Sequence, residues 1–207
     1  MGIGKKGFPL VEIIVSLAIM TIVAGAVGAF VVAGNNSYMR GNKELTLQEE
    51  AQLTANQMID LIIDVEKGIS FSNLTDQEAV DVDGNVAKDV NGMEVTNASV
   101  SELRLINNDN SYMIRWQGGA GADYADANQV YLYEVTNSKD AEGKLVVGDF
   151  DAAKPALMAE HVSSFSVDLS QVEEKRVVKL KLSFKTGNRK FEMANNITVR
   201  NKVVINN

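Results

Sequence analysis

Residues 5–34 read KKGFPLVEIIVSLAIMTIVAGAVGAFVVAG, and this stretch decides how the chain is organised. From Ile13 to Gly34 there are 22 consecutive residues without a charge. A helix that rises about 1.5 Å per residue would carry such a run across the hydrocarbon core of a bilayer. Glu12 stands immediately before the run, where an acid becomes costly if it enters the membrane. The stretch predicts a membrane-spanning helix and leaves one carboxylate to be explained.

Two ordinary interpretations account for parts of this segment. A secretory signal peptide has an apolar run of only about 7–15 residues and a cleavage site after it. An uncleaved anchor with Lys5 and Lys6 on the cytoplasmic side explains both the length and the lysines. Glu12 is left unexplained by the anchor.

The motif KKGFPLVE at residues 5–12, followed by the apolar run, resembles the class III signal of type IV prepilins and pseudopilins. The resemblance implies that a prepilin peptidase cuts between Gly7 and Phe8, and that the new N-terminal Phe8 is N-methylated. It also implies that Glu12 pairs with the N-terminal amine of a neighbouring subunit while the helices bundle in a filament core. Pro9 departs from the family's usual Thr or Ser, but proline is tolerated in the first turn of a helix.

Further segments resemble the larger, J- or W-type minor pilins and minor pseudopilins: GNKELTLQEEAQLTANQMIDLIIDVEKGI (41–69), SYMIRWQGG (111–119), VYLYEV (130–135) and ITVRN (197–201). This implies a non-enzymatic structural subunit of a type IV pilus or a type II secretion-like pseudopilus. Its partners would be prepilin peptidase, other pilin or pseudopilin subunits and, before assembly, the membrane. We expect a single pass in the cytoplasmic membrane with the C-terminus outside, followed by a cell-surface or periplasm-spanning filament. The alternatives are a permanently anchored extracellular binding or adhesion domain, and a subunit of a DNA-uptake pseudopilus.

Small residues are spaced by four in the apolar run, as in the pairs Ala24 with Gly28 and Gly25 with Ala29. This spacing lets two helices approach closely. The glycines also lower helix propensity, by roughly 1 kcal/mol each relative to alanine, and are candidate sites of local melting. Ordinary glycine enrichment in membrane helices explains them equally well.

The residues after the apolar run predict an α+β fold, in which the long helix packs on an antiparallel β-sheet. An amphipathic helix over about 37–67 is indicated by an apolar residue at every third or fourth position, and Lys67-Gly68 is a stop signal. The stripe comprises Ala51, Ala55, Met58, Ile62 and Val65, with Ile69 just beyond the helix. Together with the cut and the filament core that the resemblance implies, we expect a cleaved leader (1–7), a transmembrane or filament-core helix (8–34), an amphipathic helix (35–68) and a β-rich globular domain (69–207).

Strands are predicted from alternation of apolar and polar residues. The predicted strands cover 101–106, 112–116, 130–135, 162–169, 177–184, 190–193 and 197–204, and Asp83-Gly84-Asn85 predicts a hairpin turn between Val80 and Val86.

The chain carries a net charge of −7, and its basic residues are concentrated near the end. Residues 175–207 contain nine Lys or Arg against the single acid Glu192, about +8, which leaves about −15 on the remainder. Such an acidic bulk argues against a general nucleic-acid binder, although the basic segment keeps DNA contact open. There is no cysteine, so disulfides and cysteine-ligated metals are excluded.

No catalytic, cofactor-binding or metal-binding residue is assigned. Asp81 to Asn85 begins like a calcium loop, with Asp89 nearby, but Val86 stands where the sharp turn needs glycine and Gly92 where the bidentate glutamate belongs. A plain hairpin is the better interpretation. Asp123, Asp126 and Asn128 form a second acidic loop, which is interpreted in the same way. His161 is the only histidine, and Ser163 and Ser164 lie too close to it in sequence to indicate a triad.

Overall fold

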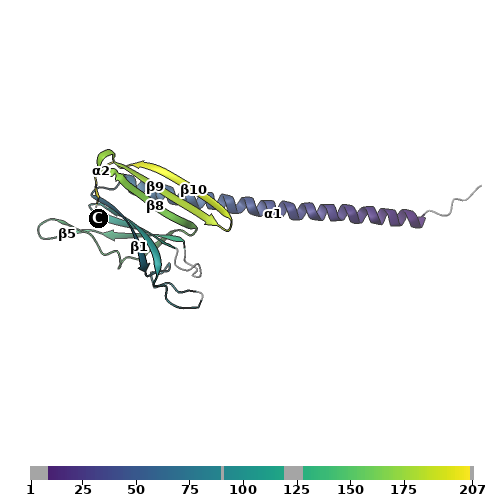
Figure 1. Cartoon of the computed structure of the whole chain (residues 1–207), viewed down its shortest axis with the longest axis horizontal. Coiled ribbons are helices and arrows are strands. Elements are labelled where there is room, and N and C mark those ends of the chain that lie inside the picture. The colour runs from purple at the N-terminus through teal and green to yellow at the C-terminus, as the bar shows by residue number, and fades with distance from the viewer. Residues whose placement is uncertain (1–8, 90, 119–127, 206–207) are drawn as a thin grey trace, which may run out of the picture. The chain divides into compact units, whose positions relative to one another are not determined.

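The computed structural model describes residues 9–89, 91–118 and 128–205. The chain divides into two compact units, Met1–Thr46 and Leu47–Asn207. Helix α1 (Pro9–Ile63) contributes to both units (Figure 1). In the first unit its residues from Leu10 onward are exposed throughout. By length and composition, this helix can cross a membrane.

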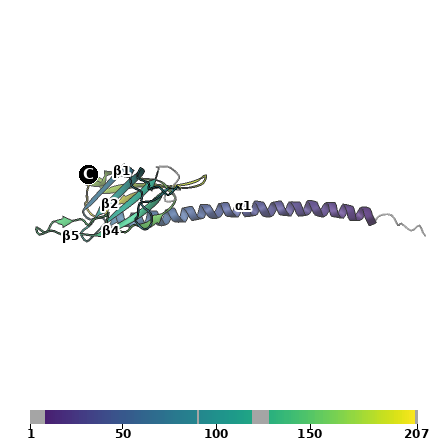
Figure 2. The ribbon, with the colours of Figure 1, turned by 90° about the horizontal axis from the view of Figure 1, so that it is seen from below.

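The second unit is built around a six-stranded sheet in the order β11-β1-β2-β3-β4-β7. Strands β1, β2 and β4 of this sheet are labelled in Figure 2. Neighbouring strands β1, β2, β3, β4 and β7 are antiparallel, and β11 pairs in parallel with β1. The bounds are β1 (Gly68–Gln77), β2 (Ala98–Ile106), β3 (Asn110–Gly118), β4 (Gln129–Thr136), β7 (Ala156–Ala159) and β11 (Val204–Ile205).

A separate three-stranded antiparallel sheet has the order β10-β9-β8. A short hairpin pairs β5 with β6, and a single helical turn, α2, connects β8 with β9. The bounds are β8 (Val162–Gln171), α2 (Val172–Lys175), β9 (Val177–Thr186), β10 (Arg189–Thr198), β5 (Ser138–Lys139) and β6 (Leu145–Val146).

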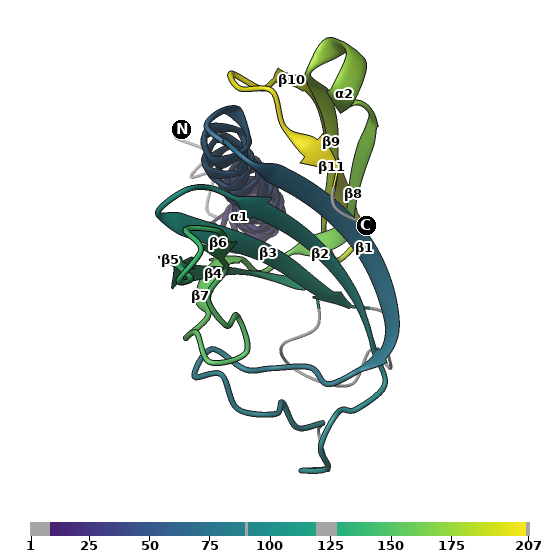
Figure 3. The same ribbon diagram turned by 90° about the vertical axis from the view of Figure 1, so that its left-hand side faces the viewer.

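The core of the second unit lies where the C-terminal part of α1 meets both sheets (Figure 3). Every third or fourth residue of α1 from Leu47 is buried, and Leu103 and Leu105 of β2 join the same core together with alternate residues of β9. The alternation in β9 buries Val178, Leu180, Leu182 and Phe184 against the helix. Full burial of one such side chain stabilises the fold by about 1.5–3 kcal/mol. The predicted α+β class, with a long helix on antiparallel strands, is thereby confirmed.

The predicted helix end was wrong by about four residues. Helix α1 ends at Ile63, and Gly68 begins strand β1 instead of closing the helix. The carbonyl of Ile63 accepts the backbone N–H of Arg200 (3.0 Å), and the carbonyl of Val65 accepts the side-chain amide of Asn201 (3.0 Å). These partners lie more than a hundred residues away, so the local pattern could not reveal them. The apolar spacing nonetheless holds, because Val65 and Ile69 are fully buried.

The predicted strand over 197–204 was also wrong. Ile197 and Thr198 complete β10, the chain then leaves the sheet, and only Val204 and Ile205 form β11. Strand β1 was not predicted, because its ten residues include Ser, Asn, Thr and Asp and resemble a loop. The remaining predicted strands correspond to β2, β3, β4, β8, β9 and β10.

Candidate functional site

Glu12 lies in the first turn of α1, and its side chain is exposed. The hydroxyl of Ser16 donates to the backbone carbonyl of Glu12 (2.7 Å), a local bond within the helix. A carboxylate in the first helical turn interacts favourably with the positive end of the helix dipole. The other two residues of the predicted processing and assembly site, Gly7 and Phe8, lie outside the described residues. Pro9 begins α1 and does not interrupt it.

The apolar part of α1 presents its side chains to the surroundings. Large side chains are exposed on all sides of the helix, and Phe30 is 80% exposed. A Cβ atom built on Gly25 or Gly28 meets nothing within 4 Å, so the space beside both glycines is open. A helix with apolar residues on every face and none of them covered needs lipid or other protein around it.

Farther along α1, Glu50 forms hydrogen bonds that link the helix to the residues immediately before β8. Its Oε1 accepts the backbone N–H groups of Glu160 (2.6 Å) and His161 (3.0 Å), and its Oε2 lies 2.6 Å from Nδ1 of His161. The lone histidine is thus engaged with the carboxylate of Glu50. Ser163, one of its sequence neighbours, donates its hydroxyl to the carbonyl of Ser183 (3.1 Å).

A cleft of about 860 Å³ lies beside β1 and β2. Its walls come from β1, β2, β8, β11 and the segment 147–151. On one side of β1 the lining is apolar, with Phe71, Val167, Leu169 and Ile205. On the other side it is charged, with Glu102, Arg104, Asp149 and Asp151. The two sides arise because successive side chains of a strand point to opposite faces of the sheet.

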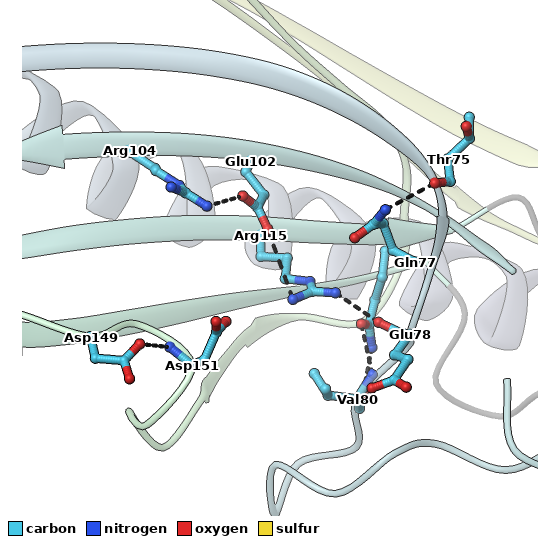
Figure 4. Close-up of polar contacts among 10 residues, drawn as sticks. Thr75, Gln77, Glu78, Val80, Glu102, Arg104, Arg115, Asp149 and Asp151 are labelled. Carbon is cyan, nitrogen blue, oxygen red and sulfur yellow. Dashed lines mark hydrogen bonds and ion pairs between the residues drawn. The ribbon is translucent and has the colours of Figure 1, made fainter. Parts of the chain in front are cut away.

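Glu102 is the centre of the charged side, and its side chain is only 6% exposed. It lies 2.8 Å from Nη2 of Arg104 and 3.8 Å from Nη1 of Arg115 (Figure 4). Arg115 also donates to the carbonyl of Glu78 (2.7 Å). Its Nε is buried without a hydrogen-bond partner in the part of the chain that the structure describes. Breaking the ion pairs of a buried carboxylate is costly, because removing one partner leaves the charge of the other uncompensated.

Tyr133 and Gln117 lie on the same face of the sheet as this cluster. Burial raises the pKa of the Tyr133 hydroxyl, against the smaller opposing influence of Arg115. The amide of Gln117 bonds to the backbone N–H of Val80 (3.0 Å) and to the carbonyl of the same residue. Gln117 thus keeps its buried amide paired and holds the long segment after β1 against the sheet.

The loop that begins like a calcium site is a closed hairpin. Oδ1 of Asp81 accepts the backbone N–H groups of Asp83 and Asn85 (2.9 Å each), and Gly84 has a φ of +85°. The same Asp-x-x-Gly turn recurs at Asp89 and Asp140, each with a glycine of positive φ three residues later. These carboxylate oxygens bond to backbone amides within their own loops. Within the described ranges, no three acidic or histidine side chains are grouped to hold a metal. Asp123 and Asp126 of the second acidic loop lie outside them, and Asn128 has a φ of +68°.

The basic segment lies mainly on β9 and β10, with lysines on the outer face of the three-stranded sheet. Lys179 pairs with Asp168 on β8 (3.2 Å), and Lys190 pairs with Glu192 (2.5 Å). Two of the lysines therefore have an acidic partner within the sheet, which lowers the positive charge available to a phosphate backbone.

The cleft and its charged cluster were not predicted from the sequence. Glu102 and Arg115 stand opposite each other in the register of β2 with β3, and that pairing became visible only in the fold. The alternation in SELRLI, with charges at every second residue, was the only indication that one face of β2 is polar. The recurrence of Asp-x-x-Gly is likewise visible in the sequence, but only the fold shows that each copy forms the same turn.

No protein-family model, curated protein or solved structure matches this chain.

Proposed function

We propose that this chain is a structural subunit of a type IV pilus or of a type II secretion-like pseudopilus, of the minor kind, assembled through its N-terminal helix. One observation supports the proposal most directly. Helix α1 carries Glu12 in its first turn, directly before a charge-free run of 22 residues, and continues into a part that packs on a β-rich unit. The helix would serve first as a membrane anchor and then as the filament core.

The composition of α1 fits a helix whose apolar surface contacts lipid before assembly and neighbouring protein helices afterwards. Residues 13–34 of α1 carry no charge and are exposed throughout, so their apolar surface is not buried against the chain itself. The open space beside Gly25 and Gly28 admits a second helix at close range. The contacts that this surface makes in lipid would be replaced by contacts with neighbouring subunits after extraction.

In this proposal, Glu12 determines how the helices of neighbouring subunits are aligned in the filament. A carboxylate at mid-bilayer costs about 2.5–3.5 kcal/mol on insertion scales, and less near the interface. Cleavage at Gly7 would create a positive amine on Phe8 of each subunit. Pairing of that amine with Glu12 of a neighbour neutralises both charges only when the helices are correctly aligned. The proposed partners are therefore prepilin peptidase, the membrane and other pilin or pseudopilin subunits.

The β-rich unit would be carried on the outside of the filament or at its tip. In this proposal it has a binding or structural role and no catalytic one. The hydrogen bonds from the β7–β8 junction to the carboxylate of Glu50 hold the packed part of α1 on that unit.

The mature N-terminus tests the proposal. The full chain is expressed with a prepilin peptidase, purified from membranes in detergent and analysed by intact-mass spectrometry. The expected product begins at Phe8 and carries one added methyl group. A matched Gly7→Leu variant should retain Met1. A wild-type product that keeps Met1, or one that begins near Ala33, would refute filament assembly; the first result fits a permanent anchor and the second a cleaved secretory signal.

A further inference from the structure

Strand β1 has one edge that is only partly paired. Along its other edge it pairs with β2 from Gly68 to Gln77, with an irregularity after Leu74. On the partly paired edge, β11 covers only Gly68 and Ile69. Beyond these two positions, no strand in the described ranges pairs with this edge.

The backbone groups at this edge can be assigned from the pairing of β11. The carbonyl of Lys67, the residue before β1, accepts the N–H of Val204 here (3.1 Å), which in this parallel pairing places the N–H of Ile69 at the same edge. In an extended chain the N–H and C=O of every second residue then point to the same edge. Phe71 and Asn73 therefore direct their backbone groups outward, whereas Ser70 and Ser72 direct theirs to β2. Unpaired groups at a sheet edge are a template for another strand.

The 860 Å³ cleft follows this edge and has different chemistry on its two sides. On the apolar side, the ring of Phe71 is held in place by an edge-to-face contact with the ring of Phe165, with centroids 5.5 Å apart. Val167, Leu169 and Ile205 complete it. An extended segment lying along β1 would place every second side chain against this apolar side.

The charged side carries an excess of negative charge. The buried carboxylate of Glu102 is already paired with Arg104 (2.8 Å) and Arg115 (3.8 Å), so the negative charge that faces solvent comes from Asp149 and Asp151. Asp149 and Asp151 are exposed, and their mutual contact is a bond from the Asp151 backbone N–H to the Asp149 carboxylate (3.0 Å). The remaining side chains of a docked segment would meet this negative surface, which favours basic residues.

We propose that the open edge of β1 binds an extended segment of a partner protein in which apolar and basic residues alternate. Its main chain would bond to Phe71 and Asn73, continuing the strand position that β11 begins. Its apolar side chains would lie against Phe71, Val167 and Leu169, and its basic side chains against Asp149 and Asp151. Main-chain bonds give such strand addition its affinity, and the alternate pockets give it specificity. The occupation of the first two positions by β11 shows that this edge accepts an added strand. The proposal goes beyond filament assembly and does not depend on it.

A peptide of eight residues with alternating Lys and Val is the probe, and the full chain in detergent is the target. Fluorescence anisotropy should show saturable binding of this peptide. Three control peptides should bind at least about tenfold more weakly. The first alternates Glu with Val, the second has the Lys and Val residues in two blocks, and the third is N-methylated at alternate backbone nitrogens. Equal binding of the block peptide or the N-methylated peptide would overturn strand addition, and so would the absence of binding by the alternating peptide.

Hydrogen exchange locates the bound segment. Upon addition of the alternating peptide, the backbone amides of Phe71 and Asn73 should exchange more slowly, whereas those of Ser70 and Ser72 are already bonded to β2 and should change little. Protection elsewhere, without protection of Phe71 and Asn73, would refute the assigned edge.

A pair of matched double variants tests the charged side. Asp149→Asn/Asp151→Asn should weaken binding of the Lys-Val peptide about tenfold. Glu173→Gln/Glu174→Gln removes the same charge from exposed residues of α2 and should leave the affinity within about twofold. Urea unfolding of each variant verifies that the fold is retained. Equal weakening by both double variants would show a general charge effect and overturn the assignment of the basic residues to Asp149 and Asp151.

Discussion

Glu50 and His161 lie 111 positions apart in the sequence, and their side chains meet at 2.6 Å between Oε2 and Nδ1. The same carboxylate accepts two backbone N–H groups at the start of β8. Hydrogen bonds to an ionised acceptor are roughly twice as strong as neutral ones. One side chain therefore sets where the packed part of α1 lies along the β-rich unit.

Glu50→Ala should lower the free energy of unfolding by about 2 kcal/mol, because it leaves two backbone N–H groups without their acceptor. Urea unfolding of the full chain in detergent, followed by the fluorescence of the single Trp116, measures the change. The neighbouring Glu49→Ala is the control; its side chain is exposed, and we expect a change within about 0.5 kcal/mol. Similar losses for the two variants would contradict the role assigned to Glu50.

Glu102→Ala should lower the free energy of unfolding by about 3 kcal/mol, because Arg115 would remain in the sheet without a counter-charge. Arg104→Met is the comparison, since the Arg104 side chain is 48% exposed and its ion pair should contribute less than about 1 kcal/mol. The same urea experiment separates them. If Arg104→Met lowers the free energy of unfolding as much as Glu102→Ala does, the buried pair of Glu102 with Arg115 is not the main source of the stabilisation.

Gly84→Ala should destabilise the chain more than Gly92→Ala. Both glycines have φ near +80°, where an added Cβ costs about 1–2 kcal/mol. A Cβ on Gly84 would also lie 3.2 Å from Cδ of Pro155, whereas one on Gly92 meets nothing within 4 Å. Thermal unfolding of the two variants in one buffer gives the comparison. A larger loss at Gly92 would show that the contact with Pro155 is unimportant.

Acid should remove a contribution that Asp168 makes to stability. Hydrogen bonds from Ser170 and Lys179 lower the pKa of Asp168 from 3.8 to about 2 in the folded chain. Because the folded pKa is the lower one, the contribution is complete above pH 4 and disappears as the pH falls from 4 to 2. The urea midpoint of Asp168→Asn should thus vary less with pH across this window than that of the wild type. An NMR titration of the Asp168 carboxyl gives the pKa directly, and a value near 4 would contradict the prediction.

Glu12→Ala should leave membrane insertion intact and reduce incorporation into filaments about tenfold or more, since the proposed pairing with the amine of Phe8 would be lost. Immunoblots of the membrane and sheared-filament fractions measure both quantities in cells that carry the assembly machinery. Ser16→Ala, one turn farther along α1, removes only a local hydroxyl and should assemble normally. Normal assembly of Glu12→Ala would refute the role proposed for that residue.

The helix and most strands were predictable because their information is local. The spacing of Ala51, Ala55, Met58 and Ile62 indicates one buried stripe, and all four are fully buried. The alternation of Val178, Leu180, Leu182 and Phe184 likewise indicated one buried face of β9. A repeating pattern within one element is visible without knowing its neighbours.

The features that were missed depend on pairings between distant segments. The end of α1 is set by Arg200 and Asn201, and the polarity of the cleft by the register of Glu102 with Arg115. Strand β1 is held by β2 and β11 despite its polar composition. Tertiary context overrides propensity at such positions. The proposed processing residues Gly7 and Phe8 lie outside the described residues, and the functional proposal rests for them on the sequence motif.

The contacts of residues 200–205 with the segment after α1 also govern when the fold can be completed. Arg200, Asn201 and Val204 supply the partners for the carbonyls of Ile63, Val65 and Lys67. These partners are synthesised well over a hundred residues later than the groups they bind. Contacts of such long sequence separation form late and slow folding. A chain that ends before Arg200 would leave the carbonyls of Ile63, Val65 and Lys67 without these partners, so the β-rich unit is complete only when its last residues have been made.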